Sequence, residues 1–218
     1  MSLNNTQRIS AAHLAGRPVQ EEARDGWPVV LEYADEGPGP WLVDLSHCMR
    51  VDIQGRPMDG LIPYDIAEPA NPGDVSILGM TLVARMGPAQ AGLWCFDPTV
   101  EIAPHFNRTQ ITEGTLGLAL LGRNSFRIAE KLTSLDLAPP RRKPPFLVQG
   151  PFCHVPCQLL VLQTAPGSEM LVLSCSRGYG RDMVHAIQEA GDEFGLRPAG
   201  ENRFVQMFAA AGAGRPVA

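Results

Sequence analysis

The chain has 218 residues, of which 44% are apolar and 19% are charged, and its formal net charge is −5. The apolar content is sufficient for a sizeable core, which excludes disorder over the whole length, and the acidic balance argues against binding nucleic acid through a basic face. No apolar run reaches the roughly 18 residues of a membrane span, and the first residues lack a signal-peptide pattern. The five cysteines are an odd number, which is typical of reduced thiols. We therefore expect a soluble cytoplasmic protein.

Glycine and proline, with 22 and 20 residues, predict short elements joined by turns rather than long helices. Residues 1–26 are polar, and we expect an N-terminal arm or a short helix that leads into the domain. Short apolar runs at 29–31 and 41–43 predict two strands, and the alternation at 49–54 predicts a third, half-buried one.

The middle of the chain continues with short elements. Four prolines within 56–75 predict a loop, and two further strands are expected at 77–84 and 93–96. An apolar run at 116–121 predicts another strand. Asn124 follows it and is suited to cap a helix that begins there.

The last third of the chain combines a hairpin with a helix. A proline-rich loop is expected at 139–145, and apolar runs at 157–162 and 170–175 predict the two strands of the hairpin. The spacing of apolar residues predicts a helix over 181–194, and a final strand is expected at 204–208. The predicted fold class is therefore α+β, with mostly antiparallel sheets and two main helices.

Several sequence segments occur in the order in which they are found in a known family. Residues 43–47 read Val-Asp-Leu-Ser-His, 119–122 read Ala-Leu-Leu-Gly, and 131–137 read Lys-Leu-Thr-Ser-Leu-Asp-Leu. Residues 190–200 read Ala-Gly-Asp-Glu-Phe-Gly-Leu-Arg-Pro-Ala-Gly. Together these segments resemble the glycine cleavage T-proteins, which are aminomethyltransferases, and residues 176–179 are loosely similar to a signature of sarcosine oxidase gamma subunits.

The resemblance implies a domain organisation and a ligand. It implies a T-protein-like folate-binding domain over 27–208, with a smaller ferredoxin-like insertion at about 56–113 and a flexible tail at 209–218. The chain would lack the C-terminal barrel of the family. Tetrahydrofolate is the implied cofactor, and the implied partner is either a lipoyl carrier protein or the subunits of a flavin-dependent oxidase.

The resemblance also suggests four residues that would contact folate. Cys48 follows the first matching segment, and Asn107 lies towards the end of the insertion, near a ligand-lining asparagine of the family. Glu169 would match the glutamate that holds the pterin after a slip of one residue. Arg203 is a displaced counterpart of an arginine that follows Pro-Ala-Gly in the family.

The sequence departs from the family where the catalytic carboxylate is expected. Residues 87–94 contain no acid, and Asp97 lies beyond the matching position, so no catalytic residue is assigned. Two functions stay open. The chain is either an aminomethyltransferase-like folate-binding protein of one-carbon metabolism that is catalytically reduced or depends on a partner, or a non-catalytic gamma-type subunit of a sarcosine oxidase-like complex.

A metal site is the main alternative for the cysteines and histidines. Cys153, His154 and Cys157 are close in sequence, and His47 adjoins Cys48. The Cys-x₃-Cys spacing differs from the paired motifs of structural zinc sites, and buried cysteines are common as small core residues. We therefore predict no metal, and His47 is expected to belong to the framework around the folate.

Overall fold

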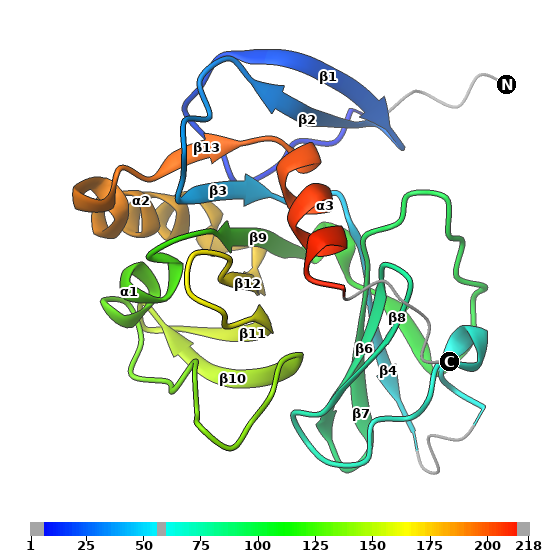
Figure 1. Ribbon diagram of the computed structural model, residues 1–218. Coiled ribbons are helices and arrows are strands. Elements are labelled where there is room, and N and C mark those ends of the chain that lie inside the picture. Colours follow the sequence, from blue (N-terminus) through cyan, green and yellow to red (C-terminus); the bar gives the residue numbers. More distant parts are fainter. Residues whose placement is uncertain (1–6, 56–59, 213–218) are drawn as a thin grey trace, which may run out of the picture.

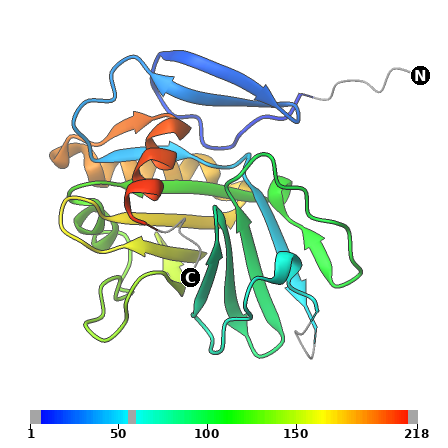
Figure 2. The same ribbon diagram turned by 45° about the vertical axis from the view of Figure 1, so that its right-hand side comes forward.

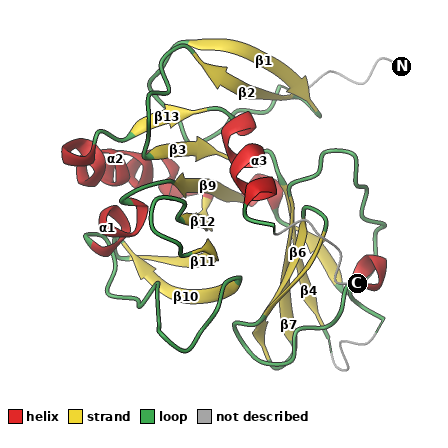
Figure 3. Ribbon diagram, viewed as in Figure 1, coloured by secondary structure: helices red, strands yellow, loops and turns green. Residues whose placement is uncertain are grey.

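A computed structural model of the chain describes residues 7–55 and 60–212. Within these ranges the fold contains two large sheets, a two-stranded hairpin and three α-helices (Figure 1). Strands make up most of the regular structure (Figure 3). The predicted α+β class with mostly antiparallel sheets is confirmed.

The larger sheet has six strands, and all neighbours pair antiparallel except the last two. In spatial order its strands are β10 (Phe146–Phe152), β11 (Val155–Gln163), β12 (Met170–Ser176), β9 (Thr115–Leu121), β3 (Trp41–Asp44) and β13 (Arg197–Ala199). The parallel pairing of β13 with β3 brings the end of the chain beside the first strands.

The second sheet has five strands, all paired antiparallel. Its spatial order is β5 (Val75–Leu78), β6 (Thr81–Gly87), β7 (Gln90–Cys95), β4 (Met49–Gln54) and β8 (Arg108–Gln110). Its strands cross the direction of the six-stranded sheet (Figure 2). A separate hairpin is formed by β1 (Pro18–Arg24) and β2 (Trp27–Tyr33).

The helices lie on opposite faces of the six-stranded sheet. Helices α1 (Ser125–Glu130) and α2 (Gly180–Gly191) pack on one face, and α3 (Glu201–Ala210) packs on the other, between this sheet and the five-stranded sheet (Figure 1). In the part of the chain that the structure describes, four short 3₁₀ turns complete the regular structure, at Pro63–Asp65, Thr112–Gly114, Arg177–Tyr179 and Asp192–Phe194.

The alternation of side chains along β9 separates the two main cores. Leu118 and Leu120 face α1 and α2, whereas Leu121 faces the second sheet and α3. In this second core Phe96, which follows β7, meets Phe204 of α3 edge to face, with ring centroids 4.8 Å apart. The five-stranded sheet is therefore packed against the rest of the protein through an apolar core.

The prediction of a strand at 204–208 is wrong, because this segment belongs to helix α3. Phe204 and Phe208 are both buried while Gln206 between them is exposed, and a spacing of four fits either a strand or a helix. The described residues thus contain three α-helices rather than two main ones. The expected tail at 209–218 begins inside α3, and residues 213–218 lie outside the described residues.

Other elements also differ from the expectation, among them the short strands β8 and β13, which the sequence did not predict. Residues 18–24 form strand β1 instead of an arm or a short helix, because its largely exposed acidic side chains conceal the pattern of a strand. The strand expected at 77–84 is divided into β5 and β6 by a turn at Gly79, whose φ is +59°. Strand β10 was not expected, because it contains Gly150 and Pro151, and both residue types are uncommon inside strands. It lies at the edge of the six-stranded sheet, where proline is tolerated.

The structure does not test the expected division into arm, domain and insertion, which stays a prediction. The five-stranded sheet extends from β4 to β8, so it begins before residue 56, where we expected the insertion to start. Residues 1–6 of the arm and 56–59 of the insertion lie outside the described residues. Among the described helices, none is long and apolar enough to cross a membrane.

Candidate functional site

A cavity of about 360 Å³ lies where the hairpin, both sheets and α3 meet. It is bounded by the end of β1, the start of β2, the connection between β3 and β4, the end of β7 and the first residue of α3. Its lining includes the side chains of Arg24, Trp27, His47, Cys48, Phe96 and Glu201. The cavity thus combines aromatic walls with a cluster of ionisable groups.

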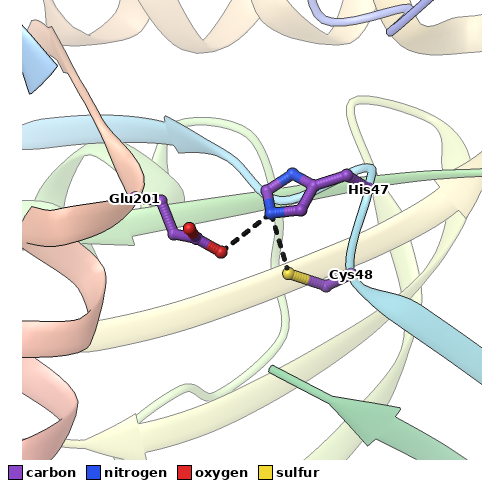
Figure 4. Close-up of side chains that lie close together, drawn as sticks. All are labelled: His47, Cys48 and Glu201. Atoms are coloured by element: carbon purple, nitrogen blue, oxygen red, sulfur yellow. Dashed lines mark hydrogen bonds and ion pairs between the residues drawn. The ribbon is translucent and has the colours of Figure 1, made fainter. Parts of the chain in front are cut away.

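His47, Cys48 and Glu201 form the centre of this cluster (Figure 4). The ring nitrogen Nε2 of His47 lies 2.8 Å from Oε1 of Glu201 and 3.5 Å from the sulfur of Cys48. The side chains of His47 and Glu201 are only 8% and 5% exposed. All three potential metal-binding atoms lie within 4.8 Å of one another.

Arg24 completes the charge arrangement at Glu201. Its Nη1 donates to Oε1 at 2.7 Å, and its Nη2 pairs with Oε2 at 2.5 Å. Burial alone would raise the pKa of Glu201, but the hydrogen bonds from His47 and Arg24 outweigh it and lower the pKa to about 2. Burial alone would lower the pKa of His47, but the Cys48 sulfur and the bond to Glu201 raise it to about 10. The cluster is therefore an ion pair at neutral pH.

A close approach between backbones positions Glu201. Gly200 precedes α3, and a Cβ at this position would lie 2.1 Å from the carbonyl carbon of Leu31 in β2. Only glycine allows the start of α3 to lie this close to the hairpin. As the first residue of α3, Glu201 also has a carboxylate at the helix N-terminus, where negative charge is favourable.

A buried arginine fixes the connection that carries His47 and Cys48. Arg50 is 3% exposed, and its guanidinium donates to the carbonyls of Leu45 and Ser46 at 3.2 and 3.0 Å. It also donates to the carbonyls of Thr112 and Thr115, both at 3.0 Å. Burial lowers the pKa of Arg50 to about 10, so the group stays charged at neutral pH. These bonds hold the connection between β3 and β4 in one conformation.

Of the four residues expected to contact folate, Cys48 lies in the wall of the cavity. Asn107 lies at the far end of β4, where its side-chain amide donates to the carbonyl of Gln54. Asn107 is not among the residues that line this cavity. The structure therefore does not bring these two expected contacts together.

Glu169 and Arg203 do not line the cavity either. The carboxylate of Glu169 accepts from the backbone N–H of Gly167 at 2.9 Å, at the tip of the β11–β12 hairpin. Arg203 forms an ion pair with Glu36 at 3.0 Å and lies over the ring of Trp41 at 4.6 Å from its centroid. No ligand is present to test the four assignments, so they stay predictions.

Glu201 is the site residue that the sequence did not reveal. It lies 154 positions from His47, and no local spacing connects them. Its position directly after Pro-Ala-Gly at 198–200 is the one signal in the sequence that could have identified it. Cys153, His154 and Cys157 are not part of the cluster, which is the one such group of ligand atoms among the described residues.

Comparisons with known proteins bear on the fold. No protein-family model and no curated protein matches the sequence. Among solved structures, a chain of the heterotetrameric sarcosine oxidase from Corynebacterium sp. U-96, in complex with pyrrole 2-carboxylate, matches with a TM-score of 0.55. The two chains share a fold. The match covers 70% of this chain and 84% of that chain at 15% sequence identity, and it does not single out the T-protein family.

Proposed function

We propose that this chain is a non-catalytic subunit of a sarcosine oxidase-like, flavin-dependent complex, and that its cavity binds a reduced folate such as tetrahydrofolate. The observation that carries the proposal is the shared fold over 84% of a chain from a heterotetrameric sarcosine oxidase. A chain that resembles one component of such an assembly is suited to act with partner subunits rather than alone.

The cavity supports the ligand part of the proposal. Its volume of about 360 Å³ lies in the range of small-molecule sites, which is roughly 300–1,000 Å³. Trp27 and Phe96 supply apolar surface for a flat ring. Arg8 also lines the cavity and pairs with Glu113 at 2.8 Å, so an anionic ligand tail could replace that carboxylate.

Aminomethyl transfer has less support than folate binding. A general base works best when its pKa is close to the working pH. Asp97 lines the cavity, but hydrogen bonds from the hydroxyl and backbone N–H of Thr99 lower the pKa of its carboxyl below the ordinary value. Asp97 is therefore a weak base and does not replace the catalytic carboxylate of the T-proteins.

Calorimetric titration of the full chain with tetrahydrofolate, kept reduced, tests the ligand. We expect saturable heat and a rise in melting temperature, and about tenfold weaker binding in Arg8→Gln because a charged hydrogen bond is lost. Arg181→Gln, an exposed change at the start of α2, is the matched control and should bind like the unaltered chain. Absence of heat and of a thermal shift at millimolar ligand would refute folate binding.

A second experiment tests the partner. The tagged chain, isolated from its native host, should be recovered with a flavoprotein whose flavin absorbance is bleached when sarcosine is added under anaerobic conditions. Recovery of the chain without flavin, or with a flavin that sarcosine does not reduce, contradicts the subunit proposal and leaves the result of the folate titration unaffected.

A further inference from the structure

The His47–Cys48–Glu201 cluster has the geometry of a set of metal ligands. Zinc binds imidazole nitrogen, thiolate sulfur and carboxylate oxygen at about 2.0–2.3 Å, which places tetrahedral ligand atoms roughly 3.3–3.7 Å apart. Here Nε2 of His47 lies 3.5 Å from the Cys48 sulfur and 2.8 Å from Oε1 of Glu201. The three ligand atoms all lie within 4.8 Å of one another, so a shift of the carboxylate away from Nε2 would admit an ion between them.

The carboxylate of Glu201 already accepts from Arg24, but the contacts of His47 leave one hydrogen for two acceptors. One hydrogen on Nε2 of His47 faces two acceptors, the sulfur of Cys48 and the carboxylate of Glu201, because both contacts use the same ring nitrogen. A divalent ion at this point would bond to all three atoms. A thiolate and a carboxylate together neutralise its two charges, and this mixed nitrogen, sulfur and oxygen set suits a borderline-soft ion such as Zn²⁺.

The surroundings also match those of a metal centre. Arg24 contacts both oxygens of Glu201, Oε1 at 2.7 Å and Oε2 at 2.5 Å, and so fixes the carboxylate with Oε1 also 2.8 Å from Nε2 of His47. Arg50 fixes the connection that carries His47 and Cys48. Three protein ligands leave a fourth tetrahedral position, which would face the cavity of about 360 Å³, as in zinc sites that bind water or a small ligand.

We propose that His47, Cys48 and Glu201 bind one divalent zinc-class ion in the wall of the cavity, with an open coordination position for water or an anionic ligand. The proposal rests on the geometry of these residues and does not depend on folate binding or on a partner subunit. Its test uses metal alone, so its outcome is separate from that of the folate titration.

Spectroscopy of the cobalt-substituted full chain, after removal of metal with a chelator, tests the site. We expect one Co²⁺ per chain, with visible bands of a four-coordinate ion and a thiolate-to-cobalt charge-transfer band. Calorimetry with Zn²⁺ should give the same stoichiometry. Cys48→Ser should lose the charge-transfer band and bind Zn²⁺ at least about 100-fold more weakly, since even changes to residues around the ligands cost 10–100-fold.

Control variants distinguish this site from adventitious binding to a thiol. Cys153→Ser, at a partly exposed cysteine outside the cluster, should keep the spectrum and the affinity. His47→Gln and Glu201→Gln should each weaken Zn²⁺ binding, and Cys48→Ala is the alternative if Cys48→Ser does not give a native circular dichroism spectrum. The proposal is overturned if the unaltered chain shows no thiolate band, or if Cys48→Ser keeps it.

Discussion

Buried charges at Glu201 depend on each other for their stability. The carboxylate of Glu201 is 5% exposed and pairs with both Arg24 and His47, which come from a hairpin and from the connection after β3. Removing one member of such a buried group leaves the remaining charges buried without a partner. This destabilises the folded state by more than replacing the whole group with apolar side chains would. The contribution of this cluster to folding is therefore tested by removing a charge without changing the shape of the side chain.

Glu201→Gln should lower the free energy of unfolding by about 3 kcal/mol, measured by urea denaturation with a chelator present to exclude metal binding. Glu193→Gln is the matched control, because Glu193 pairs with Lys131 at the exposed surface and should leave the urea midpoint nearly unchanged. Equal effects of the two variants would show that the buried cluster contributes no more than a surface ion pair.

Tyr33 gives a prediction for alkaline pH. Burial, together with the nearby carboxylates of Asp44, Glu21 and Glu36, raises the pKa of its hydroxyl from 10.0 to about 12. The folded chain therefore holds this proton above pH 10 while the unfolded chain releases it. The contribution of this shift to the free energy of unfolding is complete below about pH 10 and is lost as the pH rises towards about 12.

The stability difference between the unaltered chain and Tyr33→Phe should consequently decrease as the pH rises from about 9 to about 11 in urea denaturation. Tyr179→Phe, at an exposed tyrosine, should show no such trend relative to the unaltered chain. A constant difference for Tyr33→Phe across this range would contradict the raised pKa.

Single residues also show what the sequence could and could not predict at the site. Cys48 directly follows a segment that resembles a known family and lies in the wall of the candidate cavity, while its contact with folate stays a prediction. Glu201 was missed, because its importance depends on contacts with Arg24 and His47, which are far away in sequence. Local spacing carries no information about such contacts until the fold brings the residues together.

At the scale of elements, α3 shows why local patterns are ambiguous. The four-residue spacing of Phe204 and Phe208 fits a strand or a helix, and the choice is made by packing against Phe96 from the second sheet. By contrast, α2 was predicted well, because its longer series of apolar residues fits only a helical period and ends near Gly195 in the left-handed conformation. Elements with long patterns were predictable, and short ones depended on tertiary contacts.

The junction of α3 with the hairpin yields a prediction about glycine. Gly200→Ala should destabilise the chain by about 2 kcal/mol or more, because the added methyl group would overlap the backbone of Leu31 and force β2 away from α3. Gly178→Ala is the control, since a Cβ there meets no atom within 4 Å. Similar urea midpoints for the two variants would show that the hairpin is free to move away from α3.

At the scale of the whole molecule, the two large sheets share one apolar core. This core joins Leu121 and Val172 of the six-stranded sheet to Phe96 and Trp94 at the five-stranded sheet, with Phe204 of α3 between them. Because each sheet buries this surface against the other sheet and against α3, neither is expected to stay folded when the other unfolds. The three tryptophans of the chain lie in different parts of the fold and can report on each part separately.

Single-tryptophan variants, with the other two changed to phenylalanine, place a fluorescent probe at Trp27 in the hairpin, Trp41 in the six-stranded sheet or Trp94 in the five-stranded sheet. Within one such variant, Phe96→Ala should lower the free energy of unfolding by about 3–5 kcal/mol, because it leaves a cavity in the shared core. The loss should be the same for all three probes, since one cooperative transition gives every probe the same dependence on urea. A transition at Trp94 that separates from the one at Trp41 would show instead that the five-stranded sheet unfolds independently, and that the shared core does not couple the two sheets.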